Sequence, residues 1–164
     1  MGQSTKVIAQ YVTYYKDVSH ILVEHDQSWI DLFENQFKFL SRTRIFRLNC
    51  IMETFENCGK VRCYESFAEN LNKERFDFIL IDAPLGGDMR FISWIDVLRL
   101  IPGCLCDSFV IVLDDVNRFP ESVMLNKLKQ KLDLYGIKYR IGFYDGVKRV
   151  AVIASENLWF VTTM

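Results

Sequence analysis

Apolar residues recur along the chain in two kinds of pattern, one helical and one typical of strands. Residues 3–16 carry apolar side chains at helical spacing, which predicts a helix whose inner face is formed by Val7, Ile8, Tyr11, Val12 and Tyr15. The same spacing recurs further along and predicts a second helix, with Ile30, Phe33, Phe37 and Leu40 on its inner face. Short apolar runs over residues 19–24 and 44–48 predict a strand on either side of this second helix.

The middle of the chain contains its longest apolar runs. Residues 66–72 predict a short helix, and residues 76–82 form a nearly continuous apolar run that ends in an acid, the pattern of a strand buried on both faces. Residues 91–101 predict a helix that is stopped by a proline and a glycine. Residues 108–113 predict another fully buried strand. Residues 49–61 show no clear pattern.

The end of the chain predicts a helix followed by a hairpin. Met124, Leu128 and Leu132 share one face of the helix expected over residues 121–135. Residues 138–143 and 149–154 then predict two antiparallel strands joined at Asp145-Gly146. Because strands and helices alternate before this hairpin, we expect an α/β fold with a mostly parallel, doubly wound sheet and a single domain over residues 1–164.

Composition excludes several classes of function. The chain has 164 residues and a formal net charge of −1, and it carries no basic stripe, so tight binding to a nucleic-acid backbone is not expected. No apolar run has the length of a membrane span, and the start has no signal-peptide core. The five cysteines are an odd number at irregular spacing, which favours reduced, buried or half-buried structural thiols in a cytoplasmic protein.

Three buried runs end in acids, and this is the main functional signal in the sequence. Glu24, Asp82 and the pair Asp114-Asp115 follow their predicted strands directly. In open α/β sheets, ligands bind outside the carboxyl ends of the strands. The sequence therefore predicts a small-molecule crevice ringed by carboxylates.

Glu24 has the position of a ribose-binding acid. It lies about 20 residues after Gly2, the spacing between a glycine-rich turn and the acid that binds ribose hydroxyls in dinucleotide-type folds. The alternative is an acid at a strand end that is solvated or caps the next helix. Spacing alone does not decide between them.

The motifs together resemble class I S-adenosylmethionine-dependent methyltransferases. Gly2-x-Ser4-Thr5 opening a helix and Val23-Glu24-His25-Asp26 resemble the first two motifs of that superfamily, and Phe76 to Gly86 and Val112 to Arg118 resemble later segments of one branch. The similarity spans nearly the whole chain and implies a Rossmann-like methyltransferase fold. It also implies S-adenosylmethionine as cofactor and a small-molecule acceptor, with O-methylation as the expected reaction.

The resemblance implies a role for each candidate site residue. The cofactor-binding set it implies is Gly2, Ser4, Thr5, Glu24, His25, Ser66, Phe67 and Asp82. In the family the glycine loop supports the methionine part of the cofactor, the acid at Glu24 holds the ribose, and residues near Ser66 and Phe67 flank the adenine. Asp82, Asp114 and Arg118 are the candidate catalytic residues.

The beginning of the chain departs from the family pattern. Family members carry a first strand and a fuller glycine-rich loop, whereas this chain starts at the last glycine of that loop. We therefore expect an N-terminally truncated fold that lacks a central strand; the alternatives are that the neighbouring strands close up or that another segment fills the position. In each case the incomplete glycine loop is expected to weaken cofactor binding, because the backbone of that loop approaches the cofactor. An exposed gap or edge in the sheet would allow self-association into a homo-oligomer.

Asp82, Asp114 and Asp115 are also candidate ligands of Mg²⁺, which prefers oxygen ligands and can polarise a hydroxyl. In catechol-type O-methyltransferases, metal ligands fall at the ends of these same strands, as Asp and then Asp-Asn. The alternative is that Asp114 or Asp115 caps the following helix or pairs with Arg118 or Arg90. Pairing is favoured because the arginines already supply positive charge.

Two further readings compete with an active methyltransferase. One is a binding or structural remnant that keeps the fold and has lost the cofactor. The other is a nucleotide-binding domain of another Rossmann class, against which the absence of a G-x-G-x-x-G fingerprint counts. His25 is a candidate general base by residue type, but its place beside Glu24 favours a structural role.

Overall fold

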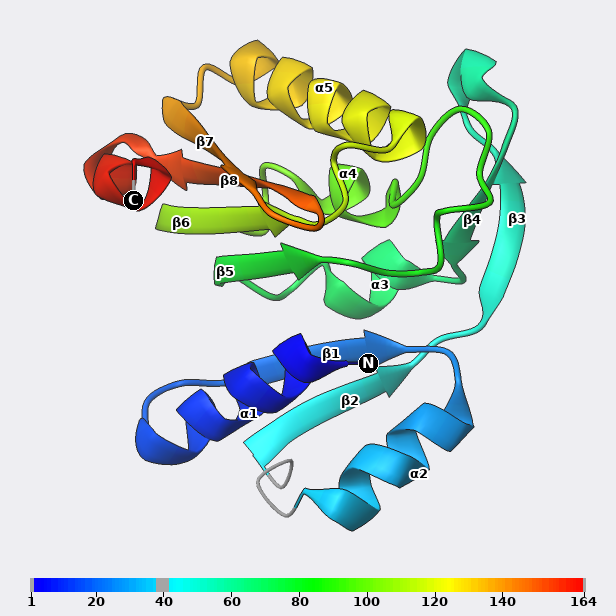
Figure 1. Ribbon diagram of the computed structural model, residues 1–164, viewed down its shortest axis with the longest axis vertical. Helices are drawn as coiled ribbons and strands as arrows, with labels where there is room; N and C mark the ends of the chain where they lie inside the picture. Colours follow the sequence, from blue (N-terminus) through cyan, green and yellow to red (C-terminus); the bar gives the residue numbers. More distant parts are fainter. Residues whose placement is uncertain (1, 38–41, 164) are drawn as a thin grey trace. The chain divides into compact units, whose positions relative to one another are not determined.

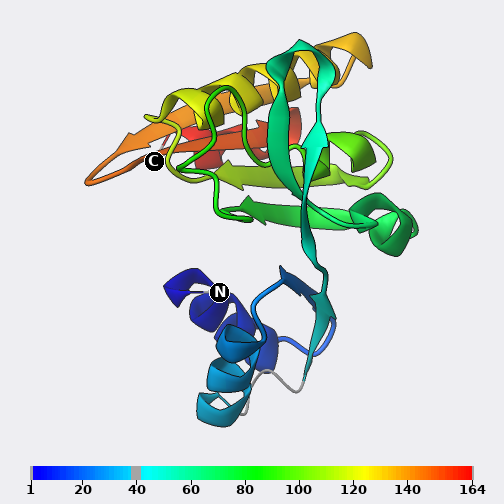
Figure 2. The ribbon, with the colours of Figure 1, turned by 90° about the vertical axis from the view of Figure 1, so that its right-hand side faces the viewer.

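A computed structural model describes residues 2–37 and 42–163. The chain divides into two compact units, residues 1–49 and residues 50–164. Figures 1 and 2 show the elements of both. That the two units form one domain, as expected from the sequence, stays a prediction.

The first unit is built from two helices and a pair of parallel strands. Helix α1 (Gln3–Tyr14) and strand β1 (His20–Glu24) are followed by α2 (Gln27–Gln36) and β2 (Thr43–Arg47). Strands β1 and β2 pair in parallel from His20 opposite Thr43 to Glu24 opposite Arg47. All four elements were expected, and their bounds differ from the predicted ones by a few residues at most.

The inner face of α1 differs from the predicted one. Its buried residues are Thr5, Ala9 and Val12, whereas Val7, Tyr11 and Tyr15 of the expected face are exposed. The small side chain of Ala9 packs with Phe33 of α2, and Phe37 contacts this cluster. The pattern was misread because the tyrosines were counted as core, although their hydroxyl ends tolerate water. Leu40, expected on the same face as Phe37, lies outside the described residues.

The second unit is centred on a four-stranded sheet in the order β5-β6-β8-β7. Strand β5 (Phe76–Ile81) pairs in parallel with β6 (Leu105–Leu113). Strands β7 (Tyr139–Asp145) and β8 (Arg149–Ser155) form the expected antiparallel hairpin, and β8 pairs antiparallel with β6. A mixed α/β architecture is therefore present. The mostly parallel sheet is present only in part, since two of the strand pairs among the described residues are parallel and three are antiparallel.

Helix α5 (Phe119–Leu134) lies alongside this sheet (Figures 1 and 2). Met124, Leu128 and Leu132 are fully buried, as the sequence predicts. Helix α3 (Phe67–Leu71) is close to its expected range. In contrast, the helix expected over residues 91–101 is reduced to α4 (Asp96–Leu100), because residues 91–95 form an irregular segment in which Trp94 has a positive φ of 57°.

The segment without a clear sequence pattern is a second hairpin. Strand β3 (Cys50–Thr54) pairs antiparallel with β4 (Lys60–Tyr64), and a 3-10 turn over Glu56–Cys58 joins them. Gly59, with a φ of 74°, closes this turn in the left-handed region that favours glycine. The chain ends in a 3-10 segment (Glu156–Thr162) that the sequence pattern did not reveal.

Strand β5 does not have the central position that its apolar sequence indicates. Its only strand partner among the described residues is β6, and Phe78 is 45% exposed. In the first unit, β1 likewise pairs only with β2 among the described residues. Each unit therefore has an apolar strand with one edge unpaired by any described strand, a feature that proteins normally cover.

No helix in the described part of the chain is both long enough and apolar enough to cross a membrane.

Candidate functional site

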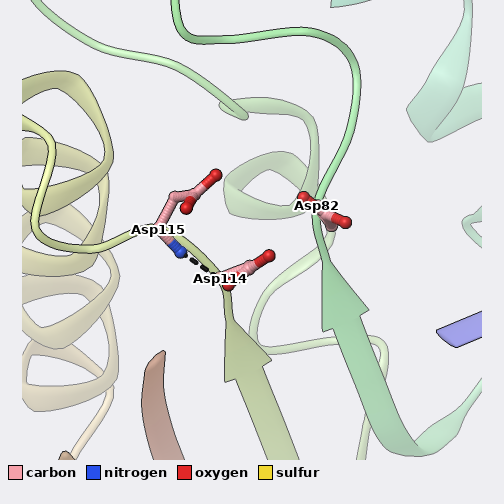
Figure 3. Close-up of side chains that lie close together, drawn as sticks. All are labelled: Asp82, Asp114 and Asp115. Carbon is pink, nitrogen blue, oxygen red and sulfur yellow. Dashed lines mark hydrogen bonds between the residues drawn. The ribbon is translucent and has the colours of Figure 1, made fainter. Parts of the chain in front are cut away.

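Three carboxylates converge where strands β5 and β6 end (Figure 3). Asp82 follows the last residue of β5, and Asp114 and Asp115 follow the last residue of β6. The backbone N–H of Asp114 donates to the carbonyl of Ile81 at 3.2 Å, which holds the two strand ends side by side. One carboxylate oxygen from each aspartate lies within 4.8 Å of the others. The sequence-predicted acids of this edge are therefore brought together; we call them the acidic cluster.

Asp115 is fixed by the turn that leads from β6 into α5. Its φ is 53°, a left-handed conformation that aspartate tolerates better than most residues. Its backbone N–H donates to Oδ1 of Asp114 at 2.9 Å, and its carbonyl accepts from the backbone N–H of Arg118 at 2.9 Å. The side chain of Asp115 is nearly buried, so its carboxylate needs a charged partner.

Two cations offset part of the negative charge of the acidic cluster. Nζ of Lys148 lies 3.0 Å from Oδ2 of Asp114 and 3.1 Å from Oδ2 of Asp115. The guanidinium of Arg118 bonds to Oδ2 of Asp115. The sequence favoured helix capping by Asp114 or Asp115, or their pairing with Arg118 or Arg90, over a metal, and the Asp115–Arg118 ion pair is one of these alternatives. Lys148 was not considered, because it lies in the turn between β7 and β8 and no motif marks it.

These contacts set the protonation of the groups around the cluster. The hydrogen bonds to Asp114 and Asp115 raise the pKa of the Lys148 ammonium. Partial desolvation raises the pKa of Asp82, and the Asp114 carboxylate raises it further, while Lys148 acts in the opposite direction. Asp82 is the exposed member of the cluster and makes no hydrogen bond or ion pair with another described side chain. It is therefore the carboxylate most accessible to a ligand.

Behind Asp115, Arg118 is held by a fully buried acid. Nε of Arg118 lies 3.5 Å from Oε1 of Glu121, whose side chain has no exposed surface. Neither carboxylate oxygen of Glu121 has a hydrogen-bond partner, so the guanidinium is its nearest compensating charge. Arg90, the other expected partner of the aspartates, stacks on the Phe91 ring instead, with 4.8 Å between its Cζ and the ring centroid.

The loop after Asp82 is anchored on three sides. Nε1 of Trp94 donates to the carbonyl of Pro84 at 2.7 Å. Arg62 of β4 makes two hydrogen bonds of 2.8 Å to the carboxylate of Asp88. Gly86 packs so closely that a Cβ at this position would lie 2.7 Å from Cβ of Ser93 and 3.1 Å from Oε1 of Glu121. These contacts hold the loop that follows Asp82 of the acidic cluster in one conformation.

In the first unit, Glu24 is a buried acid at the end of β1. Only 4% of its surface is exposed. Its Oε1 accepts from the backbone N–H of His25 at 2.7 Å and of Asp26 at 3.1 Å, and Nδ1 of His25 lies 2.9 Å away. Burial acts to raise the pKa of Glu24, but hydrogen bonds, including those from Asp26 and His25, bring it below its ordinary value. Glu24 stabilises the turn into α2, and His25 has a structural contact here.

Gly2, the residue that precedes helix α1, has a conformation and surroundings that do not require glycine. Gly2 has an extended φ of −164°, and a Cβ there would contact nothing within 4 Å. Its backbone N–H donates to Oγ1 of Thr5 at 3.3 Å, and Thr5 is buried while Ser4 is exposed. Packing within the protein therefore does not require glycine at position 2.

Ser66 and Phe67, the residues expected near an adenine, lie in the second unit at the start of α3. Ser66 is exposed and has a positive φ of 54°. Phe67 is buried, and its ring stacks on Tyr64 with centroids 6.1 Å apart. Phe67 is therefore a core residue in this structure, and Ser66 is the accessible member of the pair.

The cysteines are free thiols, as expected. Cys63 and Cys104 are buried, and Cys50, Cys58 and Cys106 are half-buried. Burial raises the pKa of Cys63 to about 12 and that of Cys104 to about 11, so both stay protonated at neutral pH.

The resemblance implies S-adenosylmethionine as cofactor, and the acidic cluster suggests Mg²⁺; the residues described above bear on each differently. Glu24, a buried acid with a lowered pKa at the end of β1, belongs to the first unit, and exposed Ser66 at the start of α3 belongs to the second. Mg²⁺ does not fit the acidic cluster as it stands. Oxygens of Asp114 and Asp115 already bind the Lys148 ammonium, and a divalent cation at the same oxygens would be repelled by it and by Arg118.

Comparison with known proteins identifies the fold and leaves the function open. No family model matches the chain, and no curated protein matches it. Among solved structures, the chain is similar to "a putative caffeoyl-CoA O-methyltransferase" from Staphylococcus aureus, with a TM-score of 0.56 and 15% sequence identity; the match covers 89% of this chain and 68% of that one. At this identity the likeness shows a shared fold. The residues of the acidic cluster must therefore carry any argument about function.

Proposed function

We propose that this chain is a methyltransferase-like domain that transfers a methyl group from S-adenosylmethionine to an oxygen atom of a small molecule. The observation that carries the proposal is the acidic cluster at the ends of β5 and β6, on a fold similar to that of a protein described as an O-methyltransferase. In open α/β sheets this edge is where ligands bind. The cluster presents exposed Asp82 beside two fixed cations, which is suited to an acceptor hydroxyl.

The complete fold would be a doubly wound, Rossmann-like sheet. Strands β1 and β5 each have one edge with no described strand partner, and their sequences are those of interior strands. Strand pairing at these edges would cover them. We propose that such pairing completes a mostly parallel, doubly wound sheet in the functional protein.

The residues proposed for the cofactor are those that resemblance implies. When bound, S-adenosylmethionine supplies a methyl group on a positively charged sulfur. Glu24 would accept hydrogen bonds from the ribose hydroxyls, and Ser66 would lie beside the adenine. Gly2, Ser4 and Thr5 at the start of α1 would lie near the methionine part, where helix N–H groups favour a carboxylate.

The acceptor would bind at the acidic cluster. In the proposed transfer, the acceptor oxygen forms a bond to the methyl carbon as the carbon–sulfur bond breaks, and the hydroxyl proton passes to Asp82 and then to water. Asp114 and Asp115 hold Lys148 and Arg118, whose positive charges stabilise the oxygen as it loses its proton. Much of the rate enhancement in such a reaction comes from alignment, which the anchored loop after Asp82 would support.

A second candidate is a domain that keeps the fold and has lost the cofactor. One observation favours it: Oε1 of Glu24 is engaged with its own turn. If this reading holds, the acidic cluster serves the stability of the β6–α5 turn.

Calorimetry separates the two functions. S-adenosylmethionine and S-adenosylhomocysteine would be titrated into this chain and into a form extended upstream by one strand and a glycine-rich loop. Binding by either form, with S-adenosylhomocysteine competing, supports the methyltransferase. Binding by the extended form alone would show that the added strand and loop are required for the cofactor. No heat with either form would overturn the enzyme reading and favour the second candidate.

A further inference from the structure

Lys148 binds two of the three aspartates that a shared metal ion would use. The three aspartates contribute one oxygen each within 4.8 Å of one another; opposite ligands of a bound Ca²⁺ would be separated by about 4.6–5.2 Å. Spacing alone would therefore allow a shared cation. The Lys148 ammonium, however, bonds to Oδ2 of both Asp114 and Asp115.

The charges around the acidic cluster also bear on whether a metal ion could bind there. Lys148 and Arg118 face three aspartates, and Arg118 also pairs with the buried carboxylate of Glu121, so the carboxylates outnumber the cations. Without Lys148 the aspartate oxygens would lose one of their two cations and would favour a divalent cation. The lysine is supplied by the turn between β7 and β8, so it is a cation tethered to the fold.

We propose that Lys148 takes the place of a divalent metal ion in the acidic cluster. The site is then independent of metal. An ammonium has three N–H donors, and two of them bond to Asp114 and Asp115. The third has no partner among the described residues and is available to a ligand oxygen. In the proposed methyl transfer, on which this last step rests, Lys148 would hold the acceptor oxygen in the way that a metal ion would.

Titration with Mn²⁺, followed by loss of the free-ion electron paramagnetic resonance signal, tests the assignment without cofactor or acceptor. The wild type is expected not to bind Mn²⁺ up to about 1 mM, whereas Lys148→Met, which leaves Arg118 as the one cation beside the three carboxylates, is expected to bind at least about tenfold more tightly. Adding Asp114→Asn to Lys148→Met should remove the gained affinity. Lys148→Gln, which keeps a polar side chain of similar length, provides a second variant if Lys148→Met is unstable.

Lys138→Met is the matched control. Lys138 is exposed just before β7, and its replacement changes the net charge by the same amount. Equal gains in Lys148→Met and Lys138→Met would show a nonspecific charge effect and overturn the proposal. Tight Mn²⁺ binding by the wild type, or none by either Lys148 variant, would overturn it as well. Because these titrations need no S-adenosylmethionine, failure of the methyltransferase proposal would leave their outcome intact.

Discussion

Asp96 and Tyr64 join the start of helix α4 to the end of strand β4. Oδ1 of Asp96 accepts a hydrogen bond from the backbone N–H of Tyr64 at 3.0 Å, while Oδ2 has no hydrogen-bond partner and the residue is 3% exposed. Burial raises the pKa of Asp96 to about 7. Sequence patterns gave no sign of this residue, because a lone acid at the start of a short helix is ordinarily solvated.

The raised pKa of Asp96 predicts how stability depends on pH. The folded state keeps its proton where the unfolded state has lost it, so the contribution of Asp96 is fully present below about pH 4 and is lost as pH rises through 7. Asp96→Asn should remove this dependence. Urea unfolding at pH 5 and pH 8 should show a variant that gains stability relative to the wild type at the higher pH.

Asp107→Asn is the control for that experiment, because Asp107 is exposed on β6. It should follow the wild type at both pH values. If Asp96→Asn and the wild type lose stability in parallel between pH 5 and pH 8, the carboxyl of Asp96 is not the group responsible.

Because Arg118 pairs with buried Glu121, we expect their contributions to the free energy of unfolding to be coupled. Arg118→Met would leave the fully buried carboxylate of Glu121 without its nearest positive charge, and the expected loss of stability is about 1–3 kcal/mol. Glu121→Gln in the same chain should recover part of that loss, because no uncompensated charge then stays buried. Chemical unfolding of the two single variants and the double variant measures the coupling; strictly additive losses would show that the two side chains act independently.

Much of the second unit could be predicted from the sequence. The face of α5 formed by Met124, Leu128 and Leu132 and the β7–β8 hairpin follow from local periodicity, and the structure has both. The strand ends at Asp82 and Asp114 were also correct, because long apolar runs that stop at an acid are strong local signals. These features depend on residues close together in the chain.

Features set by contacts between distant residues could not be predicted. The β3–β4 hairpin has polar and apolar residues on both faces, so no period reveals it. Lys148 reaches Asp114 across 34 positions in the chain, and the loop at Gly86 packs against buried Glu121 across 35 positions. The inner face of α1 was misplaced since Ala9, a small residue, packs there in place of the tyrosines.

Close packing at Gly86 predicts a large effect from a single methyl group. Gly86→Ala would place Cβ 2.7 Å from Cβ of Ser93 and 3.1 Å from Oε1 of Glu121, so the loop must shift, at an expected cost of about 1–3 kcal/mol. In Gly103→Ala, the new Cβ would lie 3.5 Å from the carbonyl oxygen of Leu100, an ordinary contact. Thermal unfolding should therefore show a lower midpoint for Gly86→Ala than for Gly103→Ala. Equal midpoints would mean that the loop yields without cost.

Replacing Glu24 tests whether its carboxylate contributes to the affinity of the proposed cofactor site. Glu24→Ala should weaken binding of S-adenosylhomocysteine by about 1–3 kcal/mol, the range for a hydrogen bond to a charged group. Glu24 also accepts bonds from the turn at His25 and Asp26, so Glu24→Gln, which keeps an acceptor for these bonds, separates the two roles. Calorimetry on the form of the chain that binds, with exposed Glu34→Ala on α2 as the control, makes the measurement. If Glu24→Ala binds as tightly as Glu34→Ala, then Glu24 acts on the turn alone and contributes nothing to a ribose.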